Sequence, residues 1–223
     1  MPLITLPVAE TFHSLQGEGL YAGTPMHFLR LAGCCVGERQ NASASPVPLL
    51  RTNRPAWLCH TYDGRPFWCD TDFHKYSETT VDEFINLTSE RHICLTGGEP
   101  LIHTTQVGHL VRAAHEARKK LHVETSGTVR WSKPAGVWMT LSPKKGVLEE
   151  QVWQADELKL LVDEHFDEKN IPSFIKEHKL VYVQPVNEEL KINRKNLELC
   201  YLLLGQHPEW RLSMQIHKVL GVR

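Results

Sequence analysis

The sequence has no excess of either charge and no long apolar run. Its 25 Lys and Arg residues nearly balance 26 Asp and Glu residues, which leaves a formal net charge of -1. A nucleic-acid-binding surface needs a basic excess, so this balance argues against a nucleic-acid partner. No stretch approaches the ~20 apolar residues of a membrane helix, and the start lacks the basic and apolar segments of a signal peptide. We therefore expect a cytoplasmic protein with neither a nucleic-acid nor a membrane partner.

Disulfides are also not expected, although the chain has six cysteines. In a reducing compartment, grouped cysteines more often bind metal or do chemistry. Cys34, Cys59 and Cys69 precede a Gly-Gly-Glu-Pro segment at 97–100. Three thiolates can hold three irons of a four-iron, four-sulfur cluster and leave the fourth iron without a protein ligand. An open metal position is what substrate chemistry requires, so the pattern indicates catalysis.

Short apolar runs alternate with helical patterns along the chain. At 223 residues and 41% hydrophobic content, the chain is long enough for one sizeable core. Helical spacing of apolar residues occurs in 104–120 and 194–205. The alternation predicts an α/β fold, an incomplete (β/α) barrel of about six parallel strands, in a single domain over 1–223. The predicted strands are Met26–Leu31, His92–Thr96, Leu121–Glu124, Val137–Leu141, Leu158–Val162 and Leu180–Gln184, with 210–214 as a further edge strand.

The segment 36–68 interrupts this rhythm. Its Asn41–Pro48 run has no periodicity and little apolar bulk, so we expect a long inserted loop. The loop begins just after Cys34, carries Cys59 and ends at Cys69, which predicts that it folds around whatever the thiolates hold. Polar and glycine residues also follow the predicted strands, and in parallel α/β folds these strand ends form one ligand-binding rim.

Several motifs resemble one family in order along nearly the whole chain. They are Phe12–Gly19, Arg30–Cys34, Cys69–Phe73, Thr96–Pro100, Glu124–Gly127, Leu141–Lys144 and Trp210–Lys218. The chain thus resembles the 7-carboxy-7-deazaguanine synthases of the radical S-adenosylmethionine superfamily. The Gln-Gly-Glu-Gly opening and the Ser-Met-Gln-x-His-Lys ending are the motifs most specific to that family.

The resemblance implies a lyase that converts 6-carboxy-5,6,7,8-tetrahydropterin to 7-carboxy-7-deazaguanine with loss of ammonia, in queuosine-type 7-deazapurine biosynthesis. It implies a [4Fe-4S] cluster, S-adenosyl-L-methionine and Mg2+ as cofactors. It also implies a small-molecule pterin substrate, an electron donor such as flavodoxin or ferredoxin, and a homodimer. The chemistry is substrate-derived radical chemistry on the cofactor, so no catalytic side chain is expected.

The same resemblance assigns site residues by motif. The expected metal ligands are Cys34, Cys59 and Cys69 for the cluster and Thr71 for Mg2+. The residues expected to bind S-adenosylmethionine are Gly97, Gly98, Glu99, Ser126, Ser142 and Lys144, with the Glu99 side chain accepting from the cofactor's amino group. The residues expected to bind substrate are Gln16, Glu18, Arg30 and His217, with Arg30 and His217 as cationic partners of its carboxylate.

The cysteine spacing departs from the superfamily's compact Cys-x3-Cys-x2-Cys. Here 24 residues separate Cys34 from Cys59 and nine separate Cys59 from Cys69. Cys35 therefore stays a rival of Cys34, because adjacent thiolates rarely reach one cluster together. Two other functions stay open: a radical activating enzyme for a glycyl-radical partner, and a zinc-stabilised binding module that uses Cys34, Cys35, Cys59 and Cys69. Cys94 and Cys200 are expected to be buried as small apolar residues.

Overall fold

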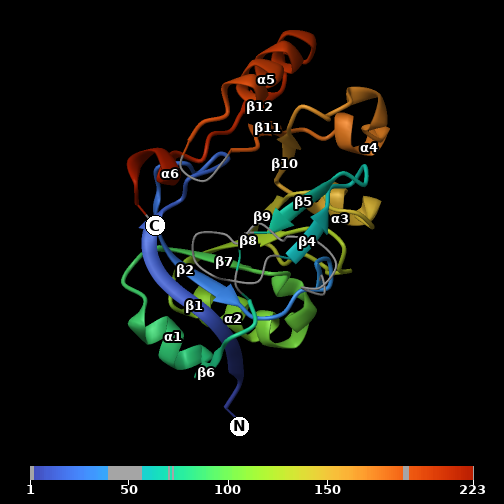
Figure 1. Ribbon diagram of the computed structural model, residues 1–223. Coiled ribbons are helices and arrows are strands. Elements are labelled where there is room, and N and C mark those ends of the chain that lie inside the picture. Colours follow the sequence, from blue (N-terminus) through green and yellow to red (C-terminus); the bar gives the residue numbers. More distant parts are fainter. Residues whose placement is uncertain (1–2, 40–56, 70, 72, 188–190, 223) are drawn as a thin grey trace.

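The fold is built on one open sheet of nine strands, in the order β12-β11-β10-β9-β8-β7-β2-β1-β6. The computed structural model (Figure 1) describes residues 3–39, 57–69, 71, 73–187 and 191–222. Neighbours from β2 to β12 pair in parallel, whereas β1 pairs antiparallel with both β2 and β6. The strands are β1 (Thr5–Leu15), β2 (Pro25–Leu31), β6 (Ser77–Thr80), β7 (His92–Gly97), β8 (Lys120–Thr125), β9 (Trp138–Leu141), β10 (Glu157–Val162), β11 (Val181–Pro185) and β12 (Arg211–Leu212).

The predicted fold class is confirmed. All six predicted strands are present and parallel, and the further edge strand is β12. The sheet does not close, because β12 and β6 stand at opposite ends of the order. The two predicted helices correspond to α2 and α5. The helices are α1 (Val81–Leu87), α2 (Thr104–Glu116), α3 (Glu149–Gln154), α4 (Ser173–Lys176), α5 (Arg194–Gln206) and α6 (Ile216–Leu220), with 3-10 turns at Pro100–His103 and Glu168–Asn170.

Strand β1 was not among the predicted strands. It contains Pro7, which cannot donate to a sheet ladder, and its register with β2 shifts between Val8 and Glu10. Beyond Val8 it pairs with β2 alone in the described sheet, since its register with β6 covers only Thr5 to Val8. A strand with a proline, a bulge and mixed polarity has a weak period-two signal, which is why the sequence pattern does not reveal it.

The main core lies between the sheet and the helices on its outer face. Leu29, Leu95 and Val123 from adjacent strands are fully buried, as are Val107 and Leu110 of α2. Each such side chain contributes about 1.5–3 kcal/mol when removed from water. Figure 1 shows α1 and α2 together on one side of β1, β2 and β7. This packing fixes the strands while leaving their carboxyl ends free to form a rim.

A second, small sheet lies within the segment expected to be a loop. Its strands β3 (Glu38–Arg39), β4 (Trp57–His60) and β5 (Pro66–Cys69) are antiparallel. The expectation of a loop throughout 36–68 was therefore wrong for these strands, and 40–56, including the Asn41–Pro48 run, lies outside the described residues. Two- to four-residue strands are too short to show a period. The β4–β5 turn is closed by Gly64, at a φ of +86°, whose N–H donates to Thr61 O at 2.9 Å.

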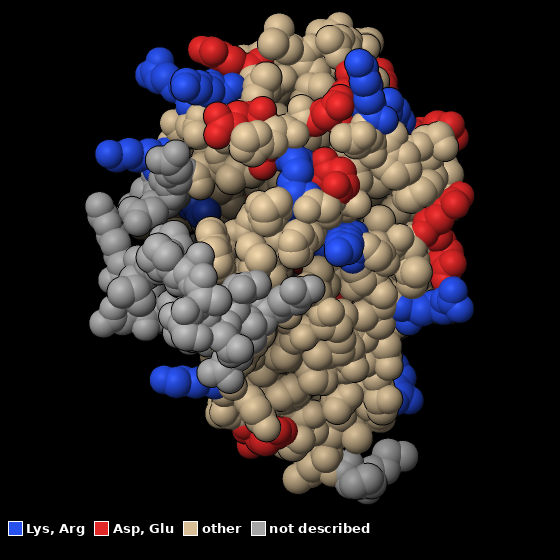
Figure 2. Space-filling view, turned by 45° about the vertical axis from the view of Figure 1, so that its right-hand side comes forward, with Lys and Arg blue, Asp and Glu red and all other residues tan. Residues whose placement is uncertain are grey.

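The described surface carries both signs of charge. Figure 2 shows basic and acidic side chains interspersed over the face drawn, in keeping with the balanced composition. Within the described ranges, no helix has both the length and the apolar character needed to cross a membrane.

Candidate active site

A pocket of about 430 Å³ brings together the residues that the sequence assigns to substrate and Mg2+. Arg30 comes from β2, and Thr71 lies just after β5. The pocket lining includes Gln16, Glu18, Arg30, Thr71, Gly97, Glu124 and His217. A larger groove of about 610 Å³ near Leu3 and α2 is lined by none of the predicted site residues. Of the strand-end residues expected to form the rim, Thr96, Gly97 and Glu124 line this pocket, whereas Gly98, Glu99, Ser126, Ser142 and Lys144 are not in its lining.

The loop after β1 and the C-terminal segment meet at this pocket. Ile216 N–H donates to Gly17 O at 3.1 Å, and Figure 1 shows α6 beside the loop that joins β1 to β2. A Cβ added to Gly17 would lie 1.7 Å from Nδ1 of His217, so only glycine allows the histidine to pack there. Burial lowers the pKa of His217, and the negative charge of Glu18 opposes that shift only in part. His217 is therefore neutral near pH 7 in this substrate-free structure.

Lys159 of β10 forms a buried ion network with Glu18 and Glu124 beneath the pocket. Its ammonium contacts Glu18 Oε2 and lies 3.3 Å from Glu124 Oε2. Glu18 Oε1 accepts from Gln215 at 2.8 Å and Gln184 at 3.1 Å. Burial alone would raise the pKa of Glu18, but the charge and hydrogen bond of Lys159 outweigh it and hold that pKa below its usual range. Glu18 is therefore an ionised acceptor in the pocket.

Sequence reasoning missed Lys159 and Glu124 as parts of this network. A signal was present, because Lys159 is a lone cation inside the apolar run of β10 and is only 5% exposed. Lysine is almost never fully buried unless paired, so its position predicts a carboxylate partner. Glu124 also accepts from Gln16 Nε2 at 3.0 Å, which connects the Gln-Gly-Glu-Gly opening to β8.

We expect Lys159→Met to destabilise the fold by about 3–5 kcal/mol, because it leaves two carboxylates beside a buried site without their cation. Urea unfolding at neutral pH measures the loss. The wild-type pair stabilises the fold above the unfolded pKa of Glu18 and loses that contribution as the pH falls, so the difference should narrow in acid. Lys120→Met, at an exposed position on β8, is the matched control and should change stability by less than ~0.5 kcal/mol. Equal losses in both variants would contradict the role of the network.

Cys59 and Cys69 lie on neighbouring strands and on the same face of the small sheet. Cys59 is opposite Phe67, two positions from Cys69, and side chains two positions apart on a strand share a face. A hydrogen bond with Cys69, burial and the proximity of Cys34 raise the pKa of the Cys59 thiol well above its usual range. The three predicted ligands therefore form one group of thiols, which is the donor set that an iron–sulfur cluster requires.

Cys34 and its neighbour Cys35 are placed differently from each other, and two further cysteines are buried. Cys34 Sγ accepts from Val36 N at 3.4 Å, on the chain segment that faces Cys59, whereas Cys35 is exposed with Sγ 3.6 Å from Thr128 Oγ1. Gly37, next to Val36, supports this placement, since a Cβ there would lie 3.4 Å from Cys59 Sγ. Cys94 and Cys200 are fully buried, as expected. This arrangement supports Cys34 over its neighbour as the first ligand.

The Gly97-Gly98 segment packs directly on the backbone that leads to Cys34. A Cβ on Gly98 would lie 2.4 Å from Gly33 O and 2.5 Å from Cys34 Cβ, and one on Gly97 would lie 2.6 Å from Leu31 O. Such distances exclude any side chain, because the clashes are mainly with backbone. The two glycines therefore allow the end of β7 to approach the cysteine-bearing exit of β2.

Glu99 is held by donors of the protein itself. Its carboxylate is completely buried and accepts from Thr125 Oγ1 at 2.8 Å, Leu101 N at 3.1 Å, and both N (2.8 Å) and Oγ of Ser126. A carboxylate offers about four accepting positions, and these four donors fill them. Glu99 therefore ties the ends of β7 and β8 together.

Ser142 and Lys144 lie between the rim and the small sheet. Lys144 Nζ donates to Ser142 Oγ at 2.8 Å and lies 5.3 Å from the centre of the Phe67 ring. The adjoining backbone pairs with β4, since Lys145 N–H donates to His60 O at 3.2 Å. Burial, with a smaller contribution from Lys159, lowers the pKa of Lys144 to about 8. A partly desolvated cation here can hold a carboxylate beside the thiol group.

Arg65 fixes the small sheet to the rim, and the sequence analysis did not identify it. Its Nε contacts Asp63 Oδ2 at 2.7 Å within the hairpin, and its Nη2 donates to Leu161 O of β10 at 3.1 Å. Asp163, just beyond β10, pairs with Nη1 at 2.5 Å. One guanidinium with several donors thus joins the cysteine-bearing hairpin to the main sheet.

The open parallel sheet, the three grouped thiols and the Gly-Gly-Glu segment define a radical S-adenosylmethionine enzyme. No family model matches the chain. The chain is 33% identical to the 7-carboxy-7-deazaguanine synthase of Synechocystis sp., over 99% of its own length and 95% of the relative's, and 32% identical to that of Bacteroides thetaiotaomicron, over 97% and 98%. The crystal structure of QueE from Escherichia coli matches with a TM-score of 0.67 at 24% identity, covering 94% of this chain and 93% of that one.

The chain belongs to the 7-carboxy-7-deazaguanine synthase family. It is therefore a lyase that needs a [4Fe-4S] cluster and S-adenosylmethionine and acts on a small molecule. The grouped Cys34, Cys59 and Cys69 fit the cluster, because three thiols are the ligands that it needs when one iron stays without a protein ligand.

Proposed function

We propose that this chain converts 6-carboxy-5,6,7,8-tetrahydropterin to 7-carboxy-7-deazaguanine with loss of ammonia, in queuosine-type 7-deazapurine biosynthesis. The observation that supports this most strongly is that one pocket is lined by Gln16, Glu18, Arg30 and His217. Its lining also includes Thr71, which follows the cysteine-bearing strand β5, and Gly97 at the end of β7. When bound, the cluster and S-adenosylmethionine would supply the radical chemistry that starts the reaction. The residues of the chain bind and orient the cofactors and the substrate and shield the reaction from solvent.

For the cofactors, Cys34, Cys59 and Cys69 hold the cluster. Gly97 and Gly98 let backbone approach S-adenosylmethionine, and Glu99 keeps that loop in place through its four hydrogen bonds. The remaining cofactor contacts on the rim are Ser126, Ser142 and Lys144.

For the substrate, Arg30 and His217 bind the carboxylate. Arg30 Nε lies 3.2 Å from Glu10 Oε2 and is part-buried, so the guanidinium is already oriented at the pocket wall. The ionised Glu18 accepts from N–H groups of the pterin edge, the Gln16 amide contacts the same edge, and Lys159 keeps Glu18 charged. A buried carboxylate held this way is a strong acceptor for N–H groups.

The same proposal includes a Mg2+ ion at Thr71. Its hydroxyl lines the pocket 3.5 Å from Arg30 Nη1, so an ion there and the guanidinium could share one substrate carboxylate. Mg2+ prefers oxygen ligands and keeps several waters, so one threonine oxygen plus substrate is a suitable set. The neighbouring Asp70 and Asp72 lie outside the described residues.

Replacing Thr71 with Ala is expected to raise the Mg2+ concentration needed for half-maximal turnover by roughly tenfold, the effect of losing about 1.4 kcal/mol of binding. Iron content and S-adenosylmethionine binding should stay unchanged. A Mg2+ titration of turnover measures the shift. Thr128→Ala, whose hydroxyl lies 2.8 Å from Ser126 Oγ on the rim but outside the pocket lining, is the control. An unchanged Mg2+ response in Thr71→Ala would show that Thr71 does not bind the ion and that its hydroxyl only supports the local turn.

We further propose that the chain works as a single domain over 1–223, as a cytoplasmic homodimer, with electrons from a flavodoxin or ferredoxin. A reducing compartment fits the sequence, because grouped cysteines there bind metal more often than they form disulfides.

The test is turnover by anaerobically reconstituted protein with S-adenosylmethionine, Mg2+ and a chemical reductant. Mass spectrometry should detect 7-carboxy-7-deazaguanine only when carboxytetrahydropterin, S-adenosylmethionine and the reductant are all present, with one ammonia released per product. Cleavage of S-adenosylmethionine that carboxytetrahydropterin does not stimulate would refute the proposed substrate and favour a radical activating enzyme.

A further inference from the structure

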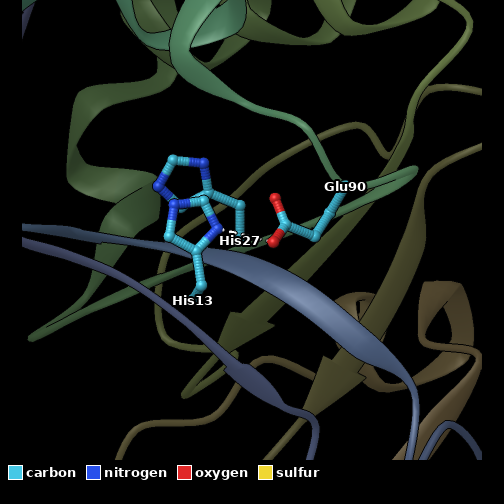
Figure 3. Close-up of side chains that lie close together, drawn as sticks. All are labelled: His13, His27 and Glu90. Atoms are coloured by element: carbon cyan, nitrogen blue, oxygen red, sulfur yellow. Dashed lines mark hydrogen bonds and ion pairs between the residues drawn. The ribbon is translucent and has the colours of Figure 1, made fainter.

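We propose that His13, His27 and Glu90 bind one divalent transition-metal ion of the zinc class, at a site separate from the grouped cysteines. His13 is on β1, His27 is on β2, and Glu90 lies between α1 and β7. One ligand atom from each lies within 4.8 Å of the other two. Figure 3 shows the two imidazoles stacked, with the carboxylate beside them. Two imidazoles and one carboxylate form a zinc ligand set that leaves a fourth position for water.

His27 is held as the neutral tautomer with its proton on Nδ1, which leaves Nε2 available to a metal. Its Nδ1 is 2.8 Å from Thr88 Oγ1, and that hydroxyl donates its own proton to Phe84 O at 2.8 Å. Nδ1 must therefore be the protonated nitrogen, and Nε2 has the lone pair. A ligand histidine usually donates its other N–H to such a partner, which fixes the ring. Burial, helped by His13, also lowers the pKa of His27 and keeps the ring neutral.

A metal can take the lone pair on His27 Nε2 without leaving the Thr11 hydroxyl without an acceptor. Thr11 Oγ1 lies 2.7 Å from Nε2 but also 3.1 Å from Phe28 O. When a metal takes the nitrogen, the Thr11 hydroxyl can donate to that carbonyl instead. The usual cost of orphaning a buried donor is therefore avoided.

Glu90 and His13 form the open side of the site. His13 Nδ1 lies 2.6 Å from Glu90 Oε1, while Ser89 Oγ donates to Glu90 Oε2 at 2.9 Å and orients the carboxylate. The His13 side chain is 53% exposed, so an ion can enter from solvent and the ring can pivot off His27. Lys119, the nearby cation, donates to the backbone carbonyls of Thr88 and Glu90 at 2.6 and 3.0 Å and so steadies the segment.

The position of the site indicates a structural ion. His27 lies near the start of β2, whereas Cys34, the first of the grouped cysteines, follows the carboxyl end of that strand at Leu31. A bound ion would join the β1–β2 hairpin to the segment after α1. Binding only to the folded state should therefore raise the thermal unfolding midpoint.

The experiment uses cluster-reconstituted protein with Zn2+ as the probe. Equilibrium dialysis should find one bound zinc, and X-ray absorption should show only nitrogen and oxygen ligands at about 2.0–2.2 Å. His13→Ala and Glu90→Gln should each weaken zinc binding at least tenfold and abolish the zinc-induced rise in unfolding temperature. His165→Ala is the matched control, because it removes an exposed histidine 3.7 Å from a carboxylate, that of Glu164, outside the cluster.

Three results would overturn the site: no zinc bound, sulfur ligands near 2.3 Å, or equal binding by wild type and both variants. Sulfur ligands would show that zinc had entered the cysteine group. His27 is only 3% exposed, so its replacement can disturb folding by itself. The variants of the half-buried Glu90 and the exposed His13 avoid that problem and make the outcome decisive.

Discussion

Replacing Cys34, Cys59 or Cys69 with Ala is expected to reduce the iron content of anaerobically prepared protein from about four per chain to near zero, and turnover to background. Each thiolate holds a different iron, and losing one leaves two ligands for a cluster that already has one open position. Iron analysis and the visible charge-transfer absorption measure the loss. Zinc in the same thiols would be colourless, so the spectrum also excludes a zinc module.

Cys35→Ala and Cys200→Ala are the matched controls and should retain the cluster. Cys35 tests the ligand choice most sharply, because it adjoins Cys34 but is exposed and directed toward Thr128. Circular dichroism of each apo-protein separates cluster loss from unfolding, which matters for the buried Cys59. Loss of iron in Cys35→Ala, with retention in Cys34→Ala, would show that the neighbouring thiol is the ligand.

Replacing Arg30 or His217 with Ala is expected to weaken carboxytetrahydropterin binding by roughly ten- to a hundredfold, with cluster and S-adenosylmethionine binding retained. Losing a hydrogen bond to a charged group costs about 1.5–3 kcal/mol, which corresponds to that range. Anaerobic titration of the pterin measures it. Arg130→Ala, at an exposed ion pair with Glu150, should have no effect.

A pterin without the carboxylate provides the second control. It should bind wild type weakly and be nearly indifferent to both replacements. Equal losses for the two pterins would disprove the carboxylate assignment. Affinity should also fall as the pH rises, because burial lowers the pKa of free His217 and a bound carboxylate would raise it. His217→Ala should lose that part of the pH dependence.

Much of the fold follows from the sequence because burial on both faces leaves a strong local pattern. β7, β10 and β11 each contain a short buried apolar run, and Leu121 and Val123 are the buried apolar residues of β8, as parallel strands under helices require. β1 and the small sheet leave no such pattern: Pro7 and a bulge interrupt the former, and the latter has strands of four residues or fewer.

The amino-acid sequence by itself determined the parallel α/β fold and the family motifs, including the paired glycines after β7, because each depends on local residue types and their spacing. Tertiary structure decided which distant groups meet: Gly17 with His217, Lys159 with Glu18, and Arg65 with the end of β10. The tertiary structure also decided that the Glu99 carboxylate accepts hydrogen bonds from Thr125 and Ser126. Such pairings depend on strand order and on which charges are buried together, and the desolvation that shifts their pKa values exists only once the chain is folded.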